Sequence, residues 1–314
     1  MGQRFLTGLG IVAVLVLAIA MRFVSLYVFD ALVGFIAICA VLEMSKLLAK
    51  MGKYNFDIIG SIHVILSYSL LLIGIILNIK LYKILIYQIV LLVGLFVLMF
   101  LFGIVFKKNT DNEIKTRKIR ISTTKFALNK SLNTLIIMVY PTLLFMGMIF
   151  INHIGELANS ISSDNLLNLS FILLVMLFTL PIFTDTFAYL TGNIFGGKKL
   201  CPKVSPNKTI SGAIGGFVWG VIGALCIFLI FNALSTYNNL FITLNLNVWH
   251  FAIVGAVSSV LCILGDLFES FLKRQASVKD SGEFFPGHGG VLDRLDSHLF
   301  NSFLIVIFAL IILI

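Results

Sequence analysis

The sequence predicts an all-α fold, a polytopic bundle of about nine transmembrane helices with a cytosolic N-terminus. Of the 314 residues, 59% are hydrophobic and 12% are charged, whereas about a quarter of the residues in soluble domains are charged. Apolar runs of roughly twenty residues, the length that crosses a bilayer, recur along the chain. Basic residues gather in alternate connections between these runs, which is the pattern that fixes membrane orientation.

The expected spans follow one another with polar connections between them. They are Phe5–Met21, Val24–Leu42, Ile58–Leu77, Leu85–Phe106, Leu132–Ile151, Ser170–Leu190, Gly212–Leu234, Val248–Leu267 and His298–Ile314. The first run, with Arg4 before it and Ala18-Ile-Ala20 near its end, also has features of a signal peptide. Because so many spans follow, we interpret it as an uncleaved first helix.

Lysines and arginines indicate which connections face the cytosol. All but three of the 23 Lys and Arg residues precede the first span or follow the second, fourth, sixth and eighth; the exceptions are Arg22, Lys80 and Lys83. The positive-inside rule then places the N-terminus in the cytosol and the C-terminus outside, which requires an odd number of spans. We therefore expect a multi-pass protein of the plasma (inner) membrane whose polar segments 191–211 and 268–297 face the cytosol.

The net charge of +9 is interpreted as this sidedness signal. The most basic connection, 107–130, lacks the interleaved aromatic residues that stack on bases, so we expect no nucleic acid partner. We expect instead a solvated loop beside anionic head groups. The four cysteines are scattered without a C-x-x-C spacing, which argues against a zinc site or a disulfide framework.

Segment 270–296 is the most polar stretch of the chain and is expected to carry the chemistry. Polar groups are costly at membrane depth and are typically functional there. On the helix that leads into this segment, Asp266, Ser270 and Lys273 are spaced i, i+4 and i+7 and so share one face. A solvated helix face would give the same pattern, but Asp266 is expected at membrane depth.

Glycines in the same segment allow its backbone to approach a ligand closely. Pro286 forces a turn, and glycine-rich backbone beside cations often cradles phosphate, although plain loops also contain glycine. The glycines are Gly287, Gly289 and Gly290, and the nearby cations are Lys273, Arg274, Lys279 and Arg294. His288 is the one histidine among them, with contact to a phosphate or base and stabilisation of the turn as its two interpretations.

Carboxylates in the C-terminal half suggest a divalent metal. Asp266, Asp280, Asp293 and Asp296 offer oxygen ligands of the kind that Mg²⁺ prefers beside substrate phosphates. Capping of the last helix is the alternative for Asp296, which precedes an apolar run. Asp185 follows Pro181, which we expect to kink its helix, and an intramembrane carboxylate is by default functional rather than structural.

The other cytosolic segment, 191–211, offers cations and hydroxyls near the start of a helix. These are Lys198, Lys208, Ser205 and Thr209. The segment lacks the spacing of a P-loop but can still bind phosphate. Together, carboxylates, cations and glycines at a membrane surface predict metal-assisted phosphoryl or nucleotidyl transfer onto a lipid. We therefore divide the chain into N-terminal transmembrane helices with the basic loop, 1–168, and a catalytic transmembrane region, 169–314.

These residues also resemble a known family. The motif S-x-x-K-R-x4-K-D-S-G-x3-P-G-H-G-G-x-x-D-R-x-D, from Ser270 to Asp296, is similar to the signature of phosphatidate cytidylyltransferase, or CDP-diacylglycerol synthase. A second stretch, D-x-x-A-Y-x-x-G-x-x-F-G-x-K-x-L-x-P-x-V-S-P-x-K-T from Asp185 to Thr209, agrees with the loop that precedes it in the family. The chain departs from the family at Asn193 and at Ile210-Ser-Gly212.

The resemblance implies that CTP and phosphatidic acid react with Mg²⁺ present to give CDP-diacylglycerol and pyrophosphate. It implies that Asp266 and Asp280 hold the metal. It further implies that other residues neutralise pyrophosphate or orient metal and substrate; these are Lys208, Lys273, Arg274 and Lys279, and Asp185, Ser205 and Ser270. The expected partners are these substrates and the bilayer, with a homodimer considered.

Two other functions fit parts of the pattern. A CTP-dependent polyprenol or phytol kinase would use the same nucleotide but transfer its γ-phosphate to an alcohol. An ion- or proton-coupled transporter would use Asp185 and Asp266 as relay residues. The transporter does not account for the glycine- and lysine-rich cytosolic segments.

Overall fold

The computed structural model describes residues 13, 16–17, 19–22, 24–77, 79, 81–116, 122–157, 163–285, 287 and 289–313. The helices of its N-terminal part are α2 (Leu26–Lys50), α3 (Asp57–Ile76), α4 (Leu81–Val105), α5 (Lys107–Thr116), α6 (Thr123–Ile137), the π-helical segment η1 (Met138–Leu143), α7 (Leu144–Asn152) and α8 (Ile154–Leu157). The later elements are α9 (Ser163–Phe195), β1 (Lys199–Cys201), β2 (Ser205–Thr209), α10 (Ile210–Asn232), α11 (Ser235–Thr243), α12 (Val248–Gln275) and α13 (Leu292–Leu313).

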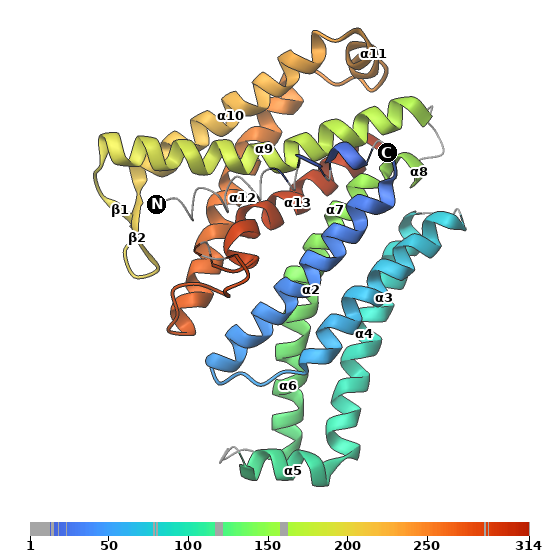
Figure 1. Cartoon of the computed structure of the whole chain (residues 1–314), viewed down its shortest axis with the longest axis vertical. Helices are drawn as coiled ribbons and strands as arrows, with labels where there is room; N and C mark the ends of the chain where they lie inside the picture. Colours follow the sequence, from blue (N-terminus) through green and yellow to red (C-terminus); the bar gives the residue numbers. More distant parts are fainter. Residues whose placement is uncertain are drawn as a thin grey trace.

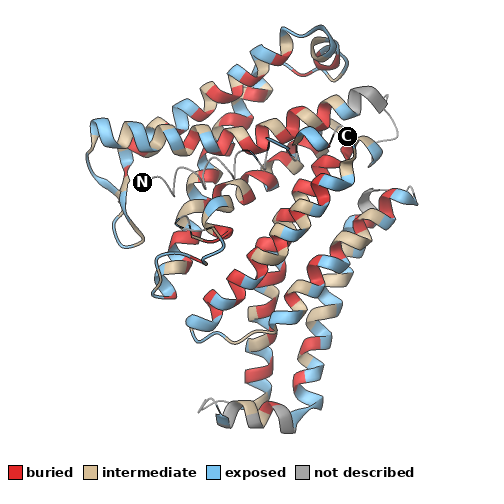
Figure 2. Ribbon diagram, in the orientation of Figure 1, coloured by how far each residue is buried: buried red, intermediate tan, exposed pale blue. Residues whose placement is uncertain are grey.

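The expected all-α membrane architecture is confirmed. Among the described residues, eight helices are long and apolar enough to cross a membrane. The first expected span, Phe5–Met21, falls mostly outside the described residues, so the total of nine and the cytosolic N-terminus stay predictions. Figure 2 shows exposed residues along the outer sides of these helices, as expected where helices meet lipid.

Helices α9, α10, α12 and α13 pack together, and α2, α3, α4 and α6 lie beside them (Figure 1). The helices α7 and α13 contact each other and join the two groups. The expected division at residue 168 falls within α9, and the assignment of two functional regions stays a prediction.

The basic connection 107–130 is not the loop expected from sequence, because much of it is helical. Ser122 caps α6 by accepting a hydrogen bond from the backbone N–H of Lys125. Phe126 and Ala127 are buried, so the first turns of α6 are held by packing as well as by the cap. The fifth span therefore begins nine residues before the expected Leu132.

Pro181 lies inside α9, and a side chain from α13 compensates for it. Proline has no N–H, so the carbonyl of Leu177 loses its helical hydrogen bond. The Asn301 amide donates to that carbonyl at 2.9 Å and to the carbonyl of Met176 at 3.3 Å. The buried amide of Asn301 thereby fixes α13 against α9 at the proline.

Glycines on one face of α10 let α9 and α12 approach closely. A Cβ atom at Gly216 would lie 2.8 Å from the Thr184 carbonyl of α9. A Cβ atom at Gly220 would lie 2.8 Å from Thr184 Oγ1 and would overlap Ser259 of α12. Small residues at such contacts are typical of membrane helices that pack without a hydrophobic driving force.

A buried polar network ties the start of α2 to the end of α7. Asp30 lies 2.5 Å from His153 Nε2, and Asn152 Nδ2 donates to Asp30 at 2.9 Å. His153 Nδ1 lies 2.7 Å from Glu156, while Arg22 Nε donates to Asn152 at 2.8 Å. Each charged group thus has an opposite partner or a hydrogen bond, which such groups require when buried.

Candidate active site

A cavity of about 480 Å³ lies between α9, α12 and the hairpin formed by β1 and β2. Four residues singled out from the sequence line it, namely Asp185, Lys208, Thr209 and Asp266. The remainder of its wall includes Ala188, Gly192, Lys199, Asn207, Gly212 and Ile263. The structure brings these four residues together in one pocket, and their roles stay predictions.

The hairpin, whose two strands the sequence did not predict, positions Lys208 at the cavity. Its strands are antiparallel, with Lys199 opposite Thr209 and Cys201 opposite Ser205. The backbone N–H of Ile210 donates to the carbonyl of Lys198 at 2.9 Å and closes the open end. A hairpin of two edge strands tolerates proline, so the two prolines of this segment do not prevent it.

The N-terminus of α10 opens onto the same cavity. Thr209 caps the helix, because its hydroxyl accepts a hydrogen bond from the Gly212 N–H at 3.1 Å. A Cβ atom at Gly212 would lie 2.6 Å from the Ala188 carbonyl, so glycine permits the close approach of α10 to α9. A helix N-terminus attracts anions through its free N–H groups and its dipole.

Lys208 forms an ion pair with Asp266, and both side chains are 27% exposed. Asp185 lies within electrostatic range of Asp266 and Lys208 and interacts with the Ser297 side chain. The pocket wall thus carries two lysines, Lys199 and Lys208, and two carboxylates, Asp185 and Asp266.

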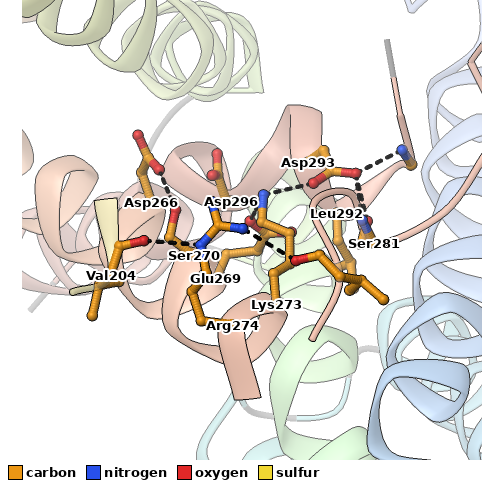
Figure 3. Close-up of polar contacts among 12 residues, drawn as sticks. Val204, Asp266, Glu269, Ser270, Lys273, Arg274, Ser281, Leu292, Asp293 and Asp296 are labelled. Atoms are coloured by element: carbon orange, nitrogen blue, oxygen red, sulfur yellow. Dashed lines mark hydrogen bonds and ion pairs between the residues drawn. The ribbon is translucent and has the colours of Figure 1, made fainter. Parts of the chain in front are cut away.

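Asp266 also belongs to a polar column on α12 that faces α13 (Figure 3). Ser270 Oγ donates to Asp266 Oδ1 at 3.4 Å, as the i, i+4 spacing predicts. Asp296 lies within electrostatic range of both Asp266 and Asp185. Because α13 begins at Leu292, Asp296 lies inside this helix and the alternative of an N-cap is wrong.

Lys273 joins α12 to α13 through two carboxylates. It pairs with Glu269, one turn earlier on its own helix, and donates to Asp293 Oδ1 at 2.7 Å (Figure 3). The Glu269 side chain is fully buried and that of Asp293 is 5% exposed. A buried cation with two anionic partners is consistent with the cost of burying unpaired charge.

Asp293 holds the glycine-rich segment against the start of α13. Its Oδ2 atom accepts hydrogen bonds from the N–H groups of Ser281 and Gly290 at 2.8 and 2.7 Å, and from Ser281 Oγ at 2.9 Å. Gly289 has φ of +87°, and a Cβ atom there would lie 2.7 Å from the same oxygen. Both oxygens of Asp293 therefore have protein partners, and its metal role stays a prediction.

Glu43 of α2 contacts the same segment and was not singled out from the sequence. Its carboxylate is buried and accepts hydrogen bonds from the N–H groups of Val291 at 2.9 Å and Leu292 at 3.0 Å. Ser281 Oγ donates to it at 3.2 Å, and a Cβ atom at Gly290 would overlap it. The one feature of the sequence that could have indicated Glu43 is its position directly after a predicted span, where a carboxylate lies near membrane depth.

Comparisons with known proteins agree with this geometry. The profile described as "Cytidylyltransferase family" matches residues 2–312. The chain belongs to the cytidylyltransferase family. It is 46% identical over 117 residues to phosphatidate cytidylyltransferase of Staphylococcus haemolyticus (strain JCSC1435), and the match covers 37% of this chain and 41% of that protein.

Two further relatives carry the same name and the same coverage. The protein of Staphylococcus aureus (strain COL) is 46% identical over 117 residues, and that of Staphylococcus epidermidis (strain ATCC 12228 / FDA PCI 1200) is 44% identical over 117 residues. Each match covers 37% of this chain and 41% of the relative. The chain thus matches less than half the length of these relatives.

The remaining described residues predicted for the site do not line the cavity. Arg274 is exposed and donates to the carbonyls of Val204 in the hairpin turn and Val278, at 3.2 and 3.3 Å. Others are placed as follows: Lys198, Lys279, Asp280, Gly287 and Arg294 are exposed, Ser205 and Gly289 are intermediate, Gly290 is buried, and His288 lies outside the described residues. Their roles in binding stay predictions.

The oxygen-rich pocket suits a divalent metal that shares its ligands with substrate. Within the described ranges, no three His, Cys, Asp or Glu side chains gather closely enough to hold a metal by themselves. The pocket itself offers Asp185 and Asp266, and hard divalent cations commonly bind one or two carboxylates together with substrate phosphates. The donors present therefore fit a metal that arrives with a nucleotide, of the kind that nucleotidyl transfer commonly uses.

Proposed function

We propose that this family member transfers the cytidylyl group of CTP to phosphatidic acid and forms CDP-diacylglycerol and pyrophosphate. The observation that carries the proposal is the pocket that joins Lys208, two carboxylates and a helix N-terminus at the ends of membrane-spanning helices. The names of the relatives support it, as does the run of motif residues from Asp185 to Asp296.

In the proposed reaction, an oxygen of the lipid phosphate attacks the α-phosphorus of CTP. The bond from that phosphorus to the oxygen bridging toward the β-phosphorus breaks, and pyrophosphate leaves with the electron pair. Lys208 exchanges its Asp266 partner for the triphosphate and neutralises the leaving group. The N–H groups at the start of α10 bind further phosphate oxygens. Lys273, Arg274 and Lys279 are assigned to pyrophosphate on the basis of the family motif.

Asp185 and Asp266 would hold a divalent cation, for which we propose Mg²⁺. When bound, this ion supplies charge neutralisation and alignment of the phosphates. Asp280, Asp293 and Asp296 complete the proposed carboxylate set, and Ser205 and Ser270 orient the ligand. Removal of divalent metal with EDTA should abolish turnover, and added Mg²⁺ should restore it.

We further propose that the cavity faces the cytosol at the plasma membrane, where CTP is available, and that the protein acts as a homodimer. The supporting observation for the orientation is the distribution of Lys and Arg over alternate connections. A Lys198→Cys variant in intact cells should resist a membrane-impermeant thiol reagent and react once the membrane is opened. Reaction in intact cells would contradict this orientation. Size analysis in detergent tests the dimer.

The decisive experiment uses the full chain in nanodiscs with phosphatidic acid, Mg²⁺ and CTP labelled on the cytidine. Label extracted with the lipid, together with release of pyrophosphate, is the expected result. Release of CDP with phosphate transferred to an alcohol would identify a lipid kinase instead. Asp185→Asn serves as the inactive control, because it keeps the side-chain shape and removes the charge.

A further inference from the structure

A second cavity lies apart from the candidate active site, between the α2–α3 connection and α6. Its volume is about 450 Å³, and none of its lining residues lines the first cavity. The lining residues are Gly52, Lys53, Tyr54, Phe126, Asn129, Lys130, Leu132 and Asn133. The connection follows one membrane-spanning helix and precedes another, so the cavity sits where the bilayer meets water.

The polar lining of this cavity suits an anion. It consists of two lysines and two asparagines besides the tyrosine, and no carboxylate is among the lining residues. Lys130 Nζ lies 2.8 Å from Glu113 Oε2 and 4.4 Å from the centre of the Phe56 ring. The Lys130 side chain is 14% exposed, so this cation is held in place, whereas Lys53 is exposed.

The walls of the cavity are fixed by contacts between the connection and α6. Asn133 Nδ2 donates to the Tyr54 carbonyl at 2.8 Å, and the rings of Tyr54 and Phe126 are 5.9 Å apart. Phe126 is buried, while Leu132 is 42% exposed. The site therefore exists before any ligand binds and combines an apolar wall with a cationic end.

This cavity lies on the same side of the membrane as the candidate active site. Glu43, which holds the glycine-rich segment, and Gly52, which lines the cavity, are separated only by the last turns of α2 and the residues that follow it. Lys50 and Lys125, which lie close in the chain to the lining residues Gly52 and Phe126, are exposed as well. Basic pockets between membrane helices on one face are typical binding sites for anionic head groups.

We propose that this cavity binds the phosphate of an anionic phospholipid from the leaflet next to the active site. The phosphate lies between Lys53 and Lys130, and the asparagines donate hydrogen bonds to its oxygens. The start of the acyl chains lies along Phe126 and Leu132. This binding is independent of CTP and of the proposed reaction.

The test is native mass spectrometry of the full chain in detergent, titrated with phosphatidylglycerol, with phosphatidylcholine as the neutral lipid. We expect preferential binding of phosphatidylglycerol, weakened about fivefold by Lys53→Gln. Lys46→Gln is the matched control, because it removes an exposed lysine of α2 that does not line the cavity, and binding should change less than twofold.

A gain of binding provides an independent readout. Glu113→Gln removes the carboxylate that competes for Lys130 and should strengthen phosphatidylglycerol binding by about fivefold. Wild-type affinity in both Lys53→Gln and Glu113→Gln would overturn the proposal. Displacement of the lipid by an equal concentration of inorganic phosphate would show a free-anion site and would overturn the assignment to a lipid. Because CTP is absent, neither result bears on nucleotidyl transfer.

Discussion

Replacing Glu43 by glutamine should slow the proposed reaction, although Glu43 lies on α2 and not in the cavity wall. The carboxylate accepts hydrogen bonds from Val291 N, Leu292 N and Ser281 Oγ. Glutamine keeps one oxygen and presents an NH₂ group where the other oxygen accepted. At least one buried N–H group then lacks an acceptor, which costs about 1–3 kcal/mol.

The lost hydrogen bond destabilises the ordered conformation of the segment that carries Asp280 and leads to Asp293. If this free-energy cost raises the transition state by the same amount, kcat/KM for CDP-diacylglycerol formation should drop about 5- to 150-fold. We expect the loss mainly in kcat, since Glu43 orders the segment and touches no substrate. Glu43→Asp should fall between the wild type and Glu43→Gln, because its shorter side chain still offers two acceptors.

Kinetics in nanodiscs with CTP and phosphatidic acid provide the measurement, and gel filtration in detergent confirms that each variant is folded. Glu283→Gln is the matched control, because Glu283 is an exposed acid of the same segment. Wild-type kcat/KM in folded Glu43→Gln would refute the reasoning. An equal loss of kcat/KM in Glu283→Gln would show that the negative charge of this part of the site matters, and not the hydrogen bonds of Glu43.

Three further predictions concern other parts of the chain. Asp280→Asn should abolish turnover while membrane insertion, measured by fractionation, stays normal. Asn301→Ala should lower stability by about 1–3 kcal/mol in thermal unfolding, because a buried carbonyl loses its partner, and Pro181→Ala in the same chain should restore part of it. Burial disfavours the charge on His153, but its bond to Asp30 outweighs this and holds its pKa above the ordinary value of 6.5. The resulting stability is present below pH 6.5 and lost as the pH rises through the higher folded pKa, so the unfolding temperature should fall over that range.

Each of these has an outcome that contradicts it. Normal activity in Asp280→Asn would remove this residue from the proposed metal site. No recovery in the double variant would mean that Asn301 stabilises the fold by other contacts than the one at Pro181. An unfolding temperature with the same pH dependence in His153→Gln as in the wild type would assign that dependence to other groups.

Much of the candidate site could be predicted because its residues lie in local patterns. The column of Asp266, Ser270 and Lys273 follows from helical spacing alone, and the structure shows the hydrogen bond between the first two. The meeting of Lys208 with Asp266 follows from two motifs that face the same side of the membrane. These inferences needed only periodicity, sidedness and the chemistry of phosphate.

Other features depend on long-range contacts that no local pattern reveals. Glu43 is distant in sequence from the segment that it holds, and nothing near it in the chain indicates those partners. The last span, expected from His298, lies in a helix that already begins at Leu292, where Asp293 accepts a hydrogen bond from the N–H of Gly290 in the preceding segment. The first turns of α6 were also not expected to be helical, because most of their exposed residues are polar. The buried side chain of Phe126 packs these turns against the rest of the protein.

The glycine face of α10 governs the distance between two carboxylates that other helices carry. Asp185 is carried by α9 and Asp266 by α12, and Gly216 and Gly220 let α10 settle between these helices. A single added methyl group would force the helices apart, and a misplacement of about 1 Å can cost a hundredfold in rate. The width of the proposed nucleotide site thus depends on glycines outside the pocket, so harmful substitutions are expected at Gly216 and Gly220 as well as in the pocket.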